Sequence, residues 1–110
     1  MKRTGVYACC ACLAVGVSAA LAAGKGDAAK GKEVFGQCAV CHNVDSTDEK
    51  MMGAPGLKGL FKRDKLKSGK KVTDASVGEK INEGGNGMPA FKDMLSDQEK
   101  DDLVAYLKTL

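Results

Sequence analysis

The chain has 110 residues, of which 17 are basic and 14 acidic, and it contains no tryptophan, two tyrosines and three phenylalanines. This length allows one domain, and so thin a core usually needs a disulfide, a metal or a cofactor to stabilise it. Lys2 and Arg3 carry most of the formal charge of +3, so the remaining chain is almost neutral, which argues against nucleic-acid binding.

The first 22 residues predict a secretory signal peptide. A basic start is followed by an uncharged run from Val6 to Leu21, and Ala20-Leu21-Ala22 forms a small-x-small cleavage site. We expect cleavage near Ala22, export to the periplasm, and a mature domain, residues 23–110, that does not span the membrane. The alternative is an uncleaved membrane anchor, for which the apolar run is slightly short.

Three of the five cysteines, at positions 9, 10 and 12, lie inside this apolar run. We interpret them as small apolar residues of the signal, because too little apolar chain precedes them for a lipid-attachment site. The mature domain then holds only Cys38 and Cys41.

A first helix is predicted to begin after Asp27, which can cap it, and to carry apolar or small residues on one face as far as Cys38. A long irregular region follows, from residue 43 to about residue 71. A second helix is predicted from Asp74, with Val77 and Ile81 pointing inward, and it stops at the glycine pair 84–85.

The last helix has the clearest signature. Ser96 and Glu99 form a capping box, and an apolar stripe follows at Leu103, Tyr106, Leu107 and Leu110. No alternating strand pattern is present. The fold class is therefore predicted to be all-α, a small domain of three to four helices with much loop.

The segment CAVCH, residues 38–42, carries the most specific chemistry. Two thiols at i and i+3 face one side of a helical turn, and His42 directly after the second can reach the centre of a flat ligand. This is the attachment pattern of one covalent c-type haem, with thioethers at Cys38 and Cys41 and iron bound by His42. A zinc site lacks ligands, a thioredoxin-like dithiol lacks its βαβ context, and a structural disulfide is the remaining alternative.

His42 is the only histidine, so the chain cannot supply a second histidine to the iron. The sixth ligand must then be a methionine, a lysine, water or nothing. The candidate methionines outside the signal are Met51, Met52, Met88 and Met94.

Several segments in order resemble the class I c-type cytochromes, in particular a small bacterial monohaem cytochrome c. They are GKEVFGQCAVCH, GAPGLKGLFKR, GNGMPAF and LSDQEKDDLVAYLKTL, and the similarity covers essentially the whole mature region. The chain departs from the mitochondrial relatives in having no tryptophan for a haem propionate, so the propionate contacts stay open.

The resemblance implies roles for individual residues. Met88 would bind the iron opposite His42, and Pro55 would accept a hydrogen bond from the free ring N–H of His42. Leu57, Leu60 and Phe91 would line the haem pocket. Arg63 would lie near a propionate or be exposed. Gly31, Phe35 and Tyr106 would meet where the first and last helices cross, as ordinary core packing.

A haem iron with both His42 and Met88 bound has no open position, so the predicted function is one-electron transfer between redox protein partners by a monomer that is not an enzyme. A run of seven basic residues and one acid, residues 58–71, could orient an acidic partner, the alternative being an ordinary solvated face. Two alternatives remain. One is a ligand-binding haem protein, either a gas sensor or a peroxidase-like enzyme, and the other is a haem module dedicated to one dehydrogenase complex.

Overall fold

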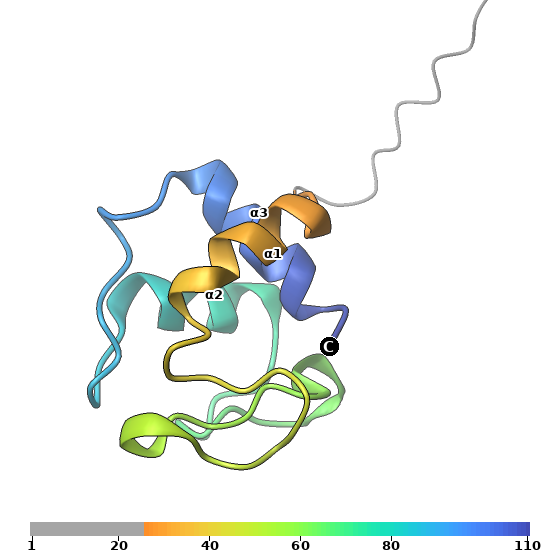
Figure 1. The fold of residues 1–110 in the computed structure, drawn as a ribbon, viewed down its shortest axis with the longest axis vertical. Helices are drawn as coiled ribbons and strands as arrows, with labels where there is room; N and C mark the ends of the chain where they lie inside the picture. The colour runs from red at the N-terminus through yellow and green to blue at the C-terminus, as the bar shows by residue number, and fades with distance from the viewer. Residues whose placement is uncertain (1–25) are drawn as a thin grey trace, which may run out of the picture.

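The structure is a computed structural model that describes residues 26–110, so the predicted signal, residues 1–22, lies outside the described residues. Three helices follow in chain order: α1 (Ala28–Val34), α2 (Asp74–Glu83) and α3 (Asp97–Leu107) (Figure 1). In the part of the chain that the structure describes there is no strand, only isolated bridges between Lys65 and Lys71 and between Gly85 and Met88. The all-α fold class is confirmed, and no described helix is long and apolar enough to cross a membrane.

Helix α1 begins where its capping residue predicts. The carboxylate of Asp27 accepts hydrogen bonds from the backbone N–H groups of Ala29 and Lys30, at 2.9 and 3.3 Å. The α-helix ends at Val34, however, and continues as the tighter 3-10 turn η1 (Phe35–Gln37), so the prediction of one helix as far as Cys38 was wrong. Such tightening is common in the last turn of a helix, and Gly36 has poor helix propensity.

Helices α1 and α3 cross at a glycine. A Cβ atom on the buried Gly31 would lie 1.9 Å from the carbonyl oxygen of Asp102, so only glycine permits this approach. Beside it, the rings of Phe35 and Tyr106 pack with their centroids 5.4 Å apart. The predicted crossing is confirmed, and it is the contact that brings the two ends of the domain together (Figure 1).

The buried carboxylate of Asp102 fastens the same crossing. Its Oδ1 accepts a hydrogen bond from the backbone N–H of Asp27 at 2.7 Å and another from Gln98 Nε2 at 2.9 Å. These bonds, the backbone one first, lower the pKa of Asp102. The carboxylate therefore stays ionised in its buried position and joins the start of α1 to α3.

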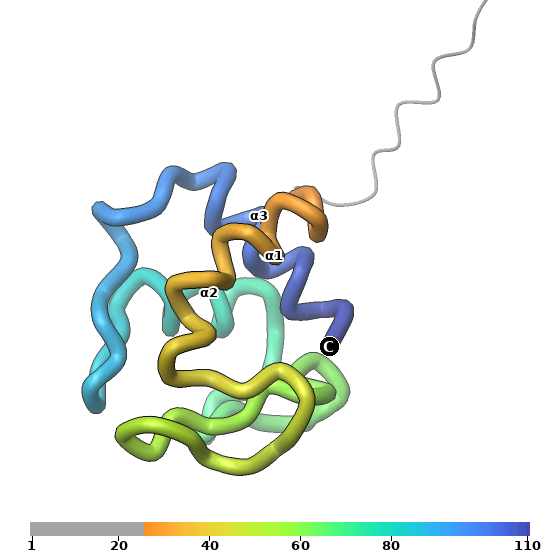
Figure 2. Tube along the Cα trace, in the orientation of Figure 1, coloured from red at the N-terminus to blue at the C-terminus, as the bar shows by residue number. Residues whose placement is uncertain are grey.

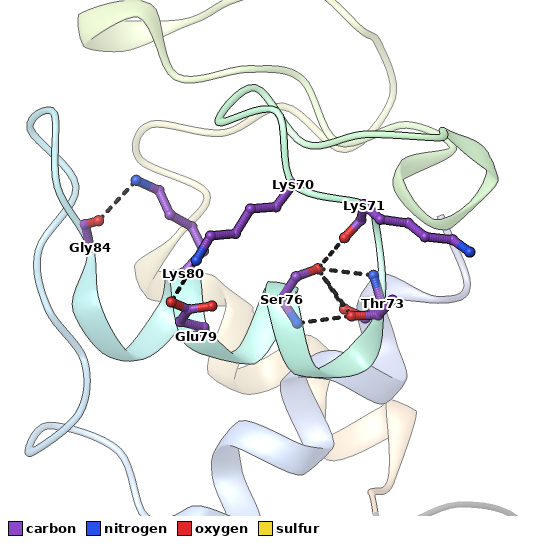
Figure 3. Close-up of polar contacts among 7 residues, drawn as sticks. All are labelled: Lys70, Lys71, Thr73, Ser76, Glu79, Lys80 and Gly84. Carbon is purple, nitrogen blue, oxygen red and sulfur yellow. Dashed lines mark hydrogen bonds and ion pairs between the residues drawn. The ribbon is translucent and has the colours of Figure 1, made fainter.

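Helices α2 and α3 both begin with capping boxes. In α3 the Ser96 hydroxyl accepts from the Glu99 N–H and Glu99 accepts from the Ser96 N–H, as the sequence predicts. In α2 the cap is Thr73, whose partner is the hydroxyl of Ser76, a pairing that the sequence reading did not anticipate (Figure 3). Helix α2 ends at Gly84, again as predicted.

The rest of the domain is loop wrapped round one side of the helices, as the trace in Figure 2 shows. Within it lie the 3-10 turns η2 (Met51–Gly53) and η3 (Leu60–Lys62). The buried apolar core draws on both parts of the molecule and comprises Phe35, Leu57, Leu60, Val77, Ile81, Phe91, Leu95, Leu103 and Leu107.

Candidate haem site

A cavity of about 520 Å³ opens between the helices and the loops. Its lining includes every residue that the sequence analysis assigned to the site: Cys38, Cys41, His42, Pro55, Leu57, Leu60, Met88 and Phe91. Most of the lining side chains are apolar, as a large macrocycle requires. The residues that come together here are 53 positions apart at the extremes, so the fold assembles the site from distant segments.

The two thiols lie on one turn because the chain stays wound after η1. The Cys38 N–H donates to the carbonyl of Phe35 at 2.7 Å, and the N–H groups of Cys41 and His42 donate to the carbonyl of Cys38 at 3.1 and 2.9 Å. Both cysteines are free thiols that line the cavity. Burial, with a smaller contribution from Cys41, raises the pKa of the Cys38 thiol, so it is protonated at neutral pH in the folded chain.

The imidazole of His42 is held by a backbone carbonyl. Its Nδ1 lies 2.8 Å from the oxygen of Pro55, and because a carbonyl can only accept, Nδ1 carries the proton. In the neutral imidazole, a proton on Nδ1 leaves the other ring nitrogen, Nε2, able to bind a metal. The predicted hydrogen bond between these two residues is therefore present, and it fixes both the tautomer and the ring orientation.

The Pro55 carbonyl is itself fixed by the loop around it. The Leu57 N–H donates to the Asn43 carbonyl at 2.7 Å, which joins this loop to the chain directly after His42. Arg63 braces the same loop from the other side, since its Nη2 donates to the carbonyls of Gly56 and Lys58, each at 2.7 Å. Arg63 is partly buried and lines the cavity, so the second of its two expected placements, a fully exposed arginine, was wrong.

Met88 lies at the end of a tight turn after α2. The N–H groups of Gly85 and Met88 each donate to the other's carbonyl, at 2.9 and 3.1 Å, and Asn86 and Gly87 between them both have positive φ. Gly84 just before the turn has φ 63° and ψ −137°, a conformation open almost only to glycine. The glycines thus shape a turn that directs the partly buried Met88 side chain to the cavity.

A lysine that the sequence analysis did not single out fastens this turn to α2. Lys80 Nζ donates to the carbonyl of Gly84 at 2.8 Å and lies 3.5 Å from that of Gly85 (Figure 3). A lysine in the last turn of a helix, four residues before a glycine stop, is the sequence signal that could have identified it.

The other methionines differ from Met88 in their surroundings. Met51 and Met52 line the cavity but are 52% and 71% exposed, whereas Met94 is 61% exposed and does not line it. Within residues 26–110, no group of three or more His, Cys, Asp or Glu side chains could hold a metal ion. The donors around the cavity therefore include two thiols, one imidazole and the partly buried thioether of Met88, and these suit a covalent haem.

Comparison with known proteins agrees with this chemistry. The family model for cytochrome c matches residues 28–110. Cytochrome c6 of Thermostichus vulcanus is 30% identical over 97% of this chain and 91% of its own length. Cytochrome c6 of Synechocystis sp. is 34% identical over 74% of this chain and 63% of its own length. Among solved structures, cytochrome c6 of the diatom Phaeodactylum tricornutum is similar with a TM-score of 0.60 and 30% identity, covering 76% of this chain and 93% of that one.

The fold and the donor set define a small haem protein of the class I c type. The chain belongs to the cytochrome c family, and it binds one covalently attached haem c that serves electron transport.

Proposed function

We propose that the protein carries single electrons between redox partners, with the haem joined to Cys38 and Cys41 and its iron bound by His42 and Met88. When bound, the haem supplies an iron that accepts and releases one electron. Nε2 of His42 and the thioether of Met88 would both bind this iron, which would leave no site for dioxygen or peroxide. The observation that carries the proposal is that the sole histidine and Met88, the one partly buried methionine among residues 26–110, line the same cavity as both thiols.

The chain's other residues support this role by limiting rearrangement. The Pro55 carbonyl holds the His42 ring, Arg63 holds the Pro55 loop, and the turn before Met88 is closed by two backbone hydrogen bonds. Ligands held this firmly change little between oxidation states, and a soft thioether favours the ferrous form. A site of this kind suits electron transfer and not bond chemistry.

The test is the visible spectrum of the haem-loaded protein with and without carbon monoxide. We expect a sulfur-to-iron charge-transfer band in the ferric wild type and no carbon monoxide binding in the ferrous wild type. Met88→Ala should lose the band and bind carbon monoxide, while Met94→Ala, altered outside the cavity, should behave as wild type. Ready carbon monoxide binding by the wild type would instead favour a ligand-binding haem protein.

We also propose that residues 1–22 are removed on export and that the mature protein, residues 23–110, works as a periplasmic monomer. Two observations support this proposal. The basic start, apolar run and small-x-small site of residues 1–22 are typical of a signal peptide, and both cysteines of residues 23–110 line the cavity. The intact mass of the purified protein tests it. The expected mass is that of residues 23–110 plus one haem, and the mass of the whole chain plus one haem would refute the cleavage.

The redox partners are proposed to be proteins, with no role for nucleic acid. In the basic stretch of residues 58–71, Lys67 pairs with Glu49 and Lys70 with Glu79, so part of its charge is met within the domain. The remaining lysines of this stretch are exposed and available to an acidic partner.

A further inference from the structure

Met52 has a backbone conformation that its residue type does not favour. Its φ of 57° and ψ of 26° lie in the left-handed region, which a long side chain without a local hydrogen-bonding group rarely adopts. Its side chain is 71% exposed, so core packing does not explain the placement. Such a conformation persists only where other contacts determine it.

The side chain of Met52 reaches across to the turn that carries Met88. A Cβ atom added to Gly87 would lie 2.8 Å from Met52 Cε and 3.8 Å from its Sδ, so the thioether end of Met52 rests on the Gly87 backbone. In Figure 1 the tip of the loop after α2 correspondingly lies beside the yellow-green turn η2. The nearest side chain to Gly87 on this side is therefore that of Met52.

The turn from which Met52 projects is anchored at both ends. Lys50 donates from its backbone N–H to the Ala54 carbonyl at 2.9 Å, and from Nζ to the Ala39 carbonyl at 2.8 Å. Lys67 Nζ donates to the Gly53 carbonyl at 3.0 Å. Because Ala39 lies between the two cysteines, η2 is tied to the segment that carries Cys38 and His42.

We propose that Met52 is a positioning residue for the sixth ligand: it spans from the anchored η2 turn to Gly87 and holds the Met88 turn at the cavity. This inference rests on the proposed binding of iron by Met88. Gly85, Asn86 and Gly87 are exposed, and the glycines give this turn little stiffness of its own. Contact from η2 limits how far the turn can swing away, and so keeps the Met88 thioether within reach of the iron.

The experiment is an imidazole titration of the ferric, haem-loaded protein, because imidazole binds only when Met88 has left the iron. Its apparent affinity rises in proportion to the fraction of molecules with Met88 dissociated. We expect Met52→Ala and Met52→Gly each to raise that affinity by about fivefold or more relative to wild type. Met52→Leu keeps an apolar side chain of similar length and should stay within about twofold of wild type. Met94→Ala, at another exposed methionine, should also stay within about twofold.

Met52→Gly distinguishes the effect of losing the side-chain contact from the effect of the strained φ at Met52. Met52→Gly removes the unfavourable φ together with the side chain, whereas Met52→Ala keeps the φ and removes only the side chain. A higher imidazole affinity in both variants supports a role for the contact between Met52 and Gly87. A rise in Met52→Ala alone, or in neither variant, overturns the proposal.

Two spectroscopic measurements on the wild type complete the test. In the wild type, a nuclear Overhauser effect between the Met52 methyl group and the Gly87 Hα protons is expected, and its absence overturns the proposal without any variant having to fold. If the ferric wild type lacks the sulfur-to-iron band, the failure lies in the proposed function. If that band is present but the Met52 variants match Met94→Ala, only the role of Met52 fails.

Discussion

The three helices α1, α2 and α3, here called the helical frame, and the loops around the cavity are stabilised by different kinds of contact. Where α1 meets α3, stability comes from close packing at Gly31, a ring pair and a buried carboxylate. Around the cavity, the chain depends on backbone hydrogen bonds, positive-φ residues and long polar side chains that reach loop carbonyls. The frame therefore governs whether the domain folds, whereas the loops govern which atoms face the haem.

The largest effect is expected where the frame is tightest. Gly31→Ala places a Cβ 1.9 Å from a backbone oxygen of α3, and the backbone cannot yield as a flexible side chain would. We expect a loss on the order of 3 kcal/mol in the free energy of unfolding, measured by denaturant titration of the haem-loaded protein.

Gly36→Ala is the matched control, because a Cβ at Gly36 meets nothing within 4 Å. It should stay within about 0.5 kcal/mol of wild type or be slightly more stable. Equal losses in the two variants would show that the helix crossing is not the tight contact described.

In the loops, Gly84→Ala should disturb the haem site while leaving the helical frame folded. Its positive φ and a Cβ contact of 2.3 Å with the Met88 carbonyl force the turn to move. We expect a cost of about 2 kcal/mol, loss of the sulfur-to-iron band and retained helical circular dichroism. Gly78→Ala, in the middle of α2 with open space around it, should keep the band and gain stability. A normal band in Gly84→Ala would mean that the turn tolerates a side chain.

Acid should weaken the frame through Asp102. Its pKa is lowered in the folded state by the Asp27 N–H first and Gln98 second, so the carboxylate contributes stability above its unfolded pKa of about 3.9. That contribution is lost as pH falls from there through the lowered folded pKa. We therefore expect the difference in melting temperature between wild type and Asp102→Asn to shrink below about pH 4. A difference that stays constant down to the acid end would contradict this linkage.

The smallest effect is expected at Lys80. Lys80→Met keeps the apolar stem but removes the ammonium group that donates to the Gly84 carbonyl, so we expect a loss of about 1 kcal/mol in unfolding free energy. The loss should come with a modest rise in imidazole affinity, since the turn before Met88 loosens. Lys70→Met, which loses an exposed pair with Glu79, should change neither quantity appreciably.

The frame was largely readable from the sequence because its signals are local. Asp27, Ser96 and Gly84 mark helix ends by their own chemistry, and the CAVCH spacing reports its ligand directly. The early end of α1 at Val34 was missed, because a switch from α to 3-10 winding leaves little trace in residue spacing. The contacts of Arg63, Lys80 and Met52 were missed for another reason: each joins segments whose proximity only the folded loops define.

The central claim is that Met88, and no other methionine, binds the iron opposite His42. Proton–carbon NMR of the ferrous protein with ¹³C-labelled methionine methyl groups tests it most directly, because the porphyrin ring current moves a ligand methyl far upfield. We predict one such resonance, absent from Met88→Leu and retained when Met51, Met52 or Met94 is replaced by leucine. No upfield methyl resonance, or one that disappears with a methionine other than Met88, would contradict the account.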